Sequence, residues 1–159
     1  MHIRKATIND IGQLRTLYRQ TIQEINSRDY DATQIAAWAA TADRISSLEK
    51  KITTQHFYVV VTPAEMVTGF ASLEDTGELD MMFVHKDFQR QGIASMLVHK
   101  LFKIAVAQQI PVLTAYVSIT AKPFFETMGF IPIEQQTVMI GETGLTNYAM
   151  QRVMEVVEK

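Results

Sequence analysis

The chain has 159 residues, 47% of them hydrophobic and 20% charged, and a net charge of −2. This balance favours one globular domain over residues 1–159 and excludes a disordered chain. There is no cysteine and no concentrated basic stretch, which excludes disulfides and thiol catalysis and argues against nucleic acid as a partner. We expect no signal peptide, no membrane-spanning segment and no membrane partner, and therefore a cytoplasmic protein.

Short strands and amphipathic helices fill the first half of the chain. A strand is predicted over residues 3–7, and Asn9 or Asp10 can cap the helix that follows. Apolar residues recur at helical spacing in three regions: 11–25, 31–38 and 42–52. Three apolar or β-branched runs are predicted as strands that pair in an antiparallel meander: 57–61, 67–73 and 78–84.

The second half begins with a helix after Gly92 and a strand over 112–117. Thr120 can cap a short helix over 121–128, and a hairpin of 130–140 with 145–153 closes the chain. The strand, helix and strand from 78 to 117 must form a parallel unit with a right-handed crossover. We therefore predict an α/β (α+β) fold: a mixed, mostly antiparallel, twisted sheet of about seven strands, with a central parallel β-α-β unit and helices on both faces.

The turn between strand 78–84 and the next helix reads Gln-Arg-Gln-Gly-Ile-Ala over residues 89–94. The first amides of a helix have no intrahelical partner, and the helix dipole favours an anion there. Gly92 removes the Cβ that would block a close approach, and Arg90 adds a positive charge. The pattern predicts a pyrophosphate ligand, although an ordinary helix start has the same form. The glycine patterns of dinucleotide and triphosphate sites are absent.

Two ordered segments identify a known family. Residues 84–94 contain Gln89, Gly92 and Ala94 in the pattern Gln/Arg-x-x-Gly-x-Gly/Ala. Residues 118–130 read Ser-Ile-Thr-Ala-Lys-Pro-Phe-Phe-Glu-Thr-Met-Gly-Phe. Together they resemble the GNAT superfamily of acetyl-CoA-dependent N-acetyltransferases. The segments Pro-Phe-Phe-Glu, Tyr30 to Trp38 and Leu-Thr-Asn-Tyr-Ala-Met (145–150) resemble one bacterial subgroup, whose acceptors are poorly defined.

The resemblance implies acetyl-CoA as the cosubstrate and no metal. It places the cofactor in a notch where strand 78–84 parts from strand 112–117, with the pantetheine arm along the main chain near Met82 and Val84. The residues that it places at the cofactor are Met82, Phe83, Val84, Gln89, Arg90, Gln91, Gly92, Ile93, Ala94, Ser95, Ser118 and Phe125. The histidines lack metal-ligand spacing.

The expected reaction is direct attack of a primary amine, from a small molecule or a peptide, on the thioester. An alkyl amine is protonated at neutral pH, so a base is needed. Glu78 and Asp80 are the candidates, because residues two apart on a strand share a face. In many members of the family a tyrosine at the position of residue 125 acts as the general acid that protonates the leaving CoA thiolate. The chain has Phe125 there, which has no hydroxyl. Tyr148, or Tyr116, can supply a hydroxyl instead, or no acid is used.

For the acceptor site, Tyr30, Gln34 and Trp38 lie on one helix face, and the negative net charge hints at cationic acceptors. A homodimer can form through an edge strand near the C-terminus. Two other functions remain as alternatives: an acyl-CoA-binding sensor without catalysis, and a nucleotide-binding α/β domain.

Overall fold

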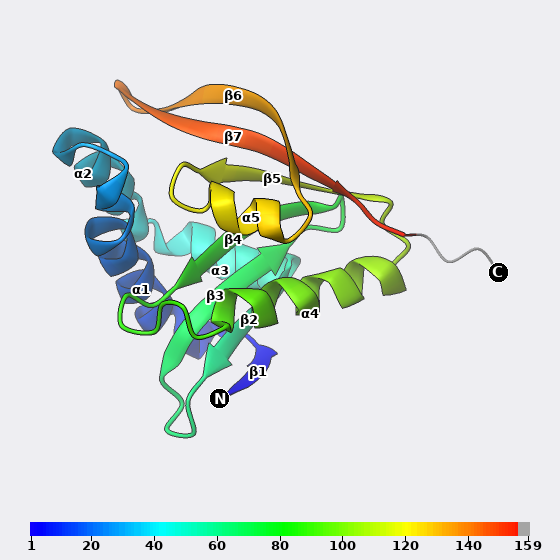
Figure 1. The fold of residues 1–159 in the computed structure, drawn as a ribbon. Coiled ribbons are helices and arrows are strands. Elements are labelled where there is room, and N and C mark those ends of the chain that lie inside the picture. Colours follow the sequence, from blue (N-terminus) through cyan, green and yellow to red (C-terminus); the bar gives the residue numbers. More distant parts are fainter. Residues whose placement is uncertain (156–159) are drawn as a thin grey trace.

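The computed structural model describes residues 1–155, whose strands form one sheet in the order β1-β2-β3-β4-β5-β7-β6 (Figure 1). The strands are β1 His2–Lys5, β2 His56–Val61, β3 Val67–Leu73, β4 Glu78–Val84, β5 Val112–Ser118, β6 Ile131–Ile140 and β7 Thr143–Val153. Only β4 and β5 pair in parallel, and the other neighbours are antiparallel. The predicted fold class is confirmed.

Helices cover both faces of the sheet (Figure 1). They are α1 Ile11–Glu24, α2 Ala32–Ala40, α3 Ile45–Thr54, α4 Ile93–Ala107 and α5 Lys122–Thr127. Side chains alternate along β2, so Val59 packs with Leu14 and Leu17 of α1 while Val60 packs with Leu97 of α4. The strand is therefore buried on both faces from Phe57 to Val61, and α1 and α3 lie on the face opposite α4 and α5. No helix within residues 1–155 is both long and apolar enough to cross a bilayer.

Two predicted helix caps are wrong. The Asp10 carboxylate accepts from the Thr7 amide and binds Arg4, so it closes the short 3₁₀ turn before α1 and makes no cap bond to α1 itself. Thr120 does not cap α5, because its hydroxyl has no hydrogen-bond partner within residues 1–155. The Ser118 hydroxyl accepts from the Ala121 amide instead, at 3.1 Å. The Asp10 carboxylate is thus engaged elsewhere, and at α5 an oxygen earlier in the loop takes the free amide.

The centre of the sheet opens where β4 and β5 part. They pair only at Glu78 with Thr114 and at Leu79 with Ala115. On the other side of β4, Ser72 of β3 opposes Met81 and Leu73 opposes Leu79, which leaves Asp80 as the extra residue of a β-bulge. A bulge bends its strand and increases the local twist. The bend at Asp80 therefore coincides with the end of β4–β5 pairing.

The main-chain groups beyond the bulge face the opening. The His85 amide donates to Thr68 O, so the odd-numbered residues beyond the bulge, Met81 and Phe83, point their N–H and C=O toward β3. In an antiparallel ladder the intervening residues point theirs the other way. Met82 and Val84 therefore present main-chain groups to the gap between β4 and β5.

Candidate active site

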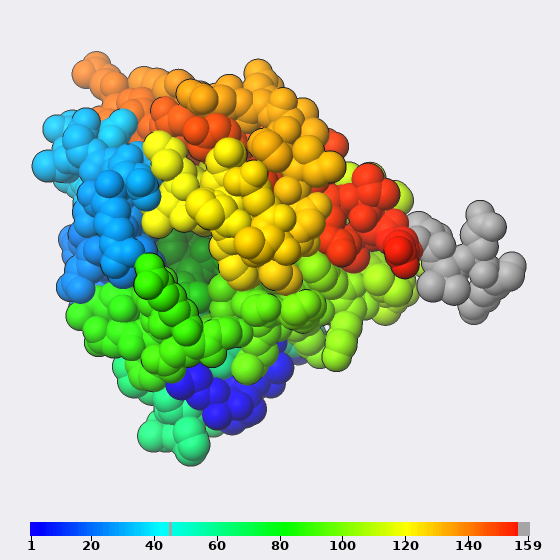
Figure 2. Space-filling model, viewed as in Figure 1, coloured from blue at the N-terminus to red at the C-terminus, as the bar shows by residue number. Residues whose placement is uncertain are grey.

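A cavity of about 690 Å³ runs through the sheet at this gap. On one face it is lined by the start of α4 and by α5, and on the other by residues of α1, α2 and α3. In Figure 2 its mouth is a hollow between the blue N-terminal helices, the yellow segment before and within α5, and the green loop before α4. Two ligands that enter from opposite faces can meet at β4.

The loop before α4 presents free amides to the cavity. Among residues 1–155, none of the amides from Arg90 to Ser95 donates to a protein acceptor; Met96 is the first to bond, to Gly92 O. Arg90 has φ +60° and Gly92 has φ +80°, both left-handed. A Cβ at Gly92 would meet nothing within 4 Å, so the approach to the main chain is open. This arrangement can bind an anion.

Gln89 holds this loop against the end of β4. Its Nε2 donates to Val84 O at 2.7 Å, and the Thr21 hydroxyl donates to the same carbonyl at 3.0 Å. Val84 O, which belongs to the stretch of main chain where the pantetheine arm was expected, is thus already bonded to the protein. The main-chain groups of Met82 and the Val84 amide remain on the side of the gap.

Most residues that were predicted to contact acetyl-CoA line the cavity. Gln91 does not, although it belongs to the same loop; those that do are Met82, Phe83, Val84, Gln89, Arg90, Gly92, Ile93, Ala94, Ser95, Ser118 and Phe125. Phe125 is buried against Phe130, with ring centroids 5.1 Å apart. Tyr148 lies outside the lining, with Lys122 Nζ 4.9 Å from its ring centroid, whereas the exposed Tyr116 lies within it.

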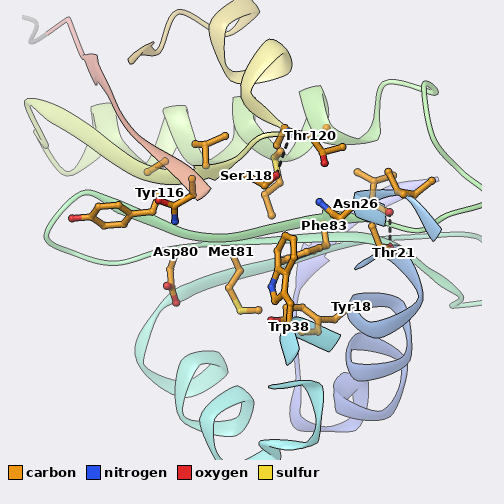
Figure 3. Close-up of a pocket in the computed structure, with 18 of the residues that line it drawn as sticks. Tyr18, Thr21, Asn26, Trp38, Asp80, Met81, Phe83, Tyr116, Ser118 and Thr120 are labelled. Atoms are coloured by element: carbon orange, nitrogen blue, oxygen red, sulfur yellow. Dashed lines mark hydrogen bonds between the residues drawn. The ribbon is translucent and has the colours of Figure 1, made fainter. Parts of the chain in front are cut away.

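The two carboxylates of β4 share the α3 face of the sheet, but only Asp80 lines the cavity (Figure 3). Its Oδ2 pairs with Lys51 Nζ and accepts from Gln55 Nε2 at 3.0 Å, which leaves Oδ1 without a partner among residues 1–155. Burial raises the pKa of Glu78 above its ordinary value of 4.5, and the neighbouring Glu74 raises it further. Glu78 is half-buried like Asp80, but it does not line the cavity.

The three residues predicted for the acceptor have separate surroundings. Trp38 lines the cavity, where its ring meets Phe83 edge-on at 6.3 Å (Figure 3). Tyr30 borders it, but its hydroxyl donates to Thr146 O and accepts from the Ile119 amide. Gln34 does not line it: its side chain caps α2 and donates to Gly144 O.

Several lining residues were absent from the sequence-based set. They include Tyr18 and Thr21 of α1, Arg44, Ser47, Leu48 and Lys51 at α3, and Asn147 of β7. A signal for the α3 group exists, because positions 44, 47, 48 and 51 recur at helical spacing. Nothing in the sequence says that this face turns to a cavity. Among residues 1–155, no three His, Cys, Asp or Glu side chains gather as a metal site.

Comparison with known proteins identifies the family. A model described as "Acetyltransferase (GNAT) domain" matches residues 26–152. The chain belongs to the GNAT acetyltransferase family. This GNAT protein is an acyltransferase, and the motifs over 84–94 and 118–130 border the cavity described above.

Relatives of this GNAT chain extend over nearly its full length. The "Uncharacterized N-acetyltransferase YafP" of Escherichia coli K12 is 32% identical over 151 residues, 95% of each chain. A GCN5-related N-acetyltransferase from Rhodopseudomonas palustris has a TM-score of 0.91 at 27% identity, covering 96% of this chain and 95% of the other. PaiA N-acetyltransferase from Thermoplasma acidophilum, solved with coenzyme A, has a TM-score of 0.80 at 18% identity, covering 96% and 98%.

Proposed function

We propose that this protein transfers an acetyl group from acetyl-CoA to a primary amine, of a small molecule or a peptide, by direct attack in a ternary complex. The observation that carries the proposal is the cavity that joins the free amides before α4 to Asp80 on the opposite face. We take residues 1–159 as one catalytic domain. A homodimer would form along β6, the outer strand, which exposes Ile131 and Met139.

Binding of CoA would depend on several groups at once. Micromolar affinity corresponds to about −8 kcal/mol. One anion at a helix N-terminus gains about 0.3–1 kcal/mol when exposed and up to about 2 when partly buried. The amides from Arg90 to Ser95, with the Arg90 guanidinium, supply the additional contacts. The coenzyme A in the PaiA structure supports this assignment through the shared fold.

Asp80 is the proposed base because it is the carboxylate of β4 that lines the cavity. Its free Oδ1 can accept a proton from the incoming ammonium, directly or through one water, while Lys51 balances its charge. Glu78 is the second candidate, because its raised pKa suits proton uptake from Asp80 through water. The main-chain amide near Val84 faces the gap and can donate to the thioester oxygen.

The leaving thiolate has no hydroxyl at the position of Phe125, Tyr148 lies outside the cavity lining, and Tyr116, which lines the cavity, is exposed to solvent. We therefore propose that CoA leaves as the thiolate, or takes a proton from water. The catalytically weak acyl-CoA sensor is the second candidate function, favoured by the same absence of an acid at Phe125.

Ligand binding is tested by thermal shift. Acetyl-CoA at about 100 times its Kd should stabilise the protein by about 2.7 kcal/mol, which is a rise of several degrees in Tm. NAD and ATP at the same concentration should raise Tm by less than acetyl-CoA does. Equal shifts from all three ligands would overturn the CoA assignment and favour a general nucleotide site.

Transfer is tested by release of CoA thiol across a panel of amines. Asp80→Asn should lower kcat/KM by about 10²–10⁴-fold at pH 7 and by less at pH 9, where more amine is already deprotonated. Glu78→Gln serves as the comparison on the same strand. An equal loss at both pH values would exclude Asp80 as the base. Acetyl-CoA binding without thiol release from any amine would leave the sensor function.

A further inference from the structure

The half of the cavity on the α3 face carries net positive charge. The charged residues that line the whole cavity are Arg44, Lys51, Asp80 and Arg90. Arg90 belongs to the loop before α4, on the other face. Lys51 and Asp80 pair with each other. Arg44 makes no ion pair among residues 1–155, so its guanidinium is the uncompensated charge in this half.

One side of α3, together with the residue that precedes the helix, supplies these cations. Ser47, Leu48 and Lys51 line the cavity from one side of α3, and Arg44, the N-cap residue, lines it from just before the first turn. The face therefore combines a guanidinium, a hydroxyl and an ammonium group around one leucine. Each of the three polar groups can donate hydrogen bonds to a carboxylate.

The remaining walls of this half are aromatic and apolar. Tyr18 packs on Phe83 with ring centroids 4.7 Å apart, and Trp38 and Met81 lie beside them (Figure 3). The Thr41 hydroxyl donates to Trp38 O at 2.7 Å, so the 2.6 Å bond between Thr41 and Tyr18 must be donated by Tyr18. The Tyr18 oxygen consequently keeps a lone pair that can accept an N–H from a ligand.

We propose that the acceptor is an amine that also bears a carboxylate, on an apolar body, as a free amino acid with an apolar side chain does. The carboxylate binds Arg44 and the other donors of α3, the apolar body packs on Trp38 and Met81, and the amine faces Asp80 and Tyr18. This inference depends on the proposed acetyl transfer for its chemistry. It contradicts the hint from net charge, because a polyamine would place further cations beside Arg44 and Lys51.

The test compares amines that differ in the carboxylate alone: phenylalanine with phenethylamine, and leucine with 3-methylbutylamine, with spermidine as the polycation. Binding to the CoA-saturated protein is measured by calorimetry, and transfer by thiol release from acetyl-CoA. The wild type should prefer each carboxylate-bearing amine about tenfold, as expected for one charge-assisted contact. In about 1 M sodium chloride the preference should shrink, because salt screens exposed charges.

Arg44→Gln should remove this preference by weakening the amino acids and leaving the simple amines unchanged, and Arg44→Lys should restore part of it. Lys50→Gln is the matched control, because Lys50 is exposed on the same helix outside the cavity lining. Any of four results would overturn the inference: equal binding within each pair of amines, tighter binding of spermidine than of the amino acids, no effect of Arg44→Gln, or no binding of either amino acid at about 10 mM. Selective binding without thiol release would instead overturn acetyl transfer and leave the recognition of amino acids standing.

Discussion

At the scale of single residues, the loop before α4 depends on left-handed backbone at Arg90 and Gly92. A left-handed conformation costs a residue with a Cβ roughly 1–2 kcal/mol. Arg90 bears that cost two residues before Gly92, which as a glycine bears none. The curvature of this loop turns consecutive amides toward the cavity, where no protein acceptor among residues 1–155 takes them.

Gly92→Glu should abolish the thermal shift produced by acetyl-CoA, because it adds bulk and negative charge at the free amides. The fold should survive, since the new Cβ meets nothing within 4 Å. The free energy of unfolding should fall by about 1–2 kcal/mol, because the left-handed backbone is costly for a residue with a Cβ. Gly141→Glu is the control: Gly141 also has positive φ and open space, but lies in the turn between β6 and β7. A normal shift in the Gly92 variant would show that the loop does not hold the cofactor.

Glu78 should make the protein less stable as the pH rises. Its pKa is raised in the fold by burial and by Glu74, so its contribution to stability is complete below pH 4.5 and is lost as the pH rises through the folded pKa. Glu78→Gln should therefore raise Tm at pH 8 and have little effect near pH 4. The group is partly solvated, so we expect less than about 1 kcal/mol, or about 2–4 °C.

The measurement is a pair of melting curves at pH 4 and pH 8, with Glu134→Gln, an exposed glutamate of β6, as the control for a change in net charge. A stabilisation by Glu78→Gln that is the same at both pH values would contradict the assignment of the raised pKa to Glu78.

At the scale of elements, α4 is positioned by its close contact with β3. A Cβ at Gly69 would lie 2.6 Å from Ile93 Cγ2 and 3.2 Å from Leu97 Cδ1. Ile93 is the first residue of α4 and is β-branched, so its side chain cannot easily turn away. The glycine therefore sets how near the free amides of α4 stand to the sheet.

Gly69→Ala should destabilise the protein by about 1–3 kcal/mol, since α4 must shift to admit the methyl group. The same shift should weaken acetyl-CoA binding, measured by calorimetry, because the amides move with Ile93. Gly12→Ala in α1 is the control: its Cβ meets nothing within 4 Å, and we expect a gain of about 0.5–1 kcal/mol. A Gly69→Ala variant with unchanged stability would refute the close packing.

At the scale of the whole molecule, the N-terminal helices close the cavity by bonding to the C-terminal half. Tyr30 bridges the loop before α5 and strand β7 through its hydroxyl, and Gln34 reaches Gly144 O at 3.0 Å. These contacts join residues 89 to 116 positions apart in the chain. They fix α2, and with it Trp38, over the gap between β4 and β5.

Tyr30→Phe should lower stability by about 1–3 kcal/mol, because it leaves the Ile119 amide and Thr146 O without their partner. Acceptor binding should weaken more than acetyl-CoA binding, since α2 borders only the α3 face of the cavity. Tyr116→Phe is the control, because Tyr116 is 58% exposed. Both variants are compared by thermal melting and by calorimetry, and equal effects would contradict the bridging role of Tyr30.

The fold was largely predictable because its signals are local. The apolar and β-branched runs of β2 and β3, the helical spacing after Gly92 and the turn residues around Gly141 each depend on a few neighbouring residues. The caps at Asp10 and Thr120 were wrong for the same reason: which oxygen reaches a free amide depends on loop geometry that residue type alone does not specify.

By itself, the sequence determined the order of the elements, the parallel unit at the centre of the sheet and the glycine turn before α4. Only the tertiary structure decided that Asp80 lines the cavity and Glu78 does not, that Gln89 bonds Val84 O, and that α3 turns its cations inward. The reason is physical: a bulge, a strand separation and the orientation of a helix arise from contacts between distant segments. Those contacts are settled only when the sheet and its two helical layers pack together.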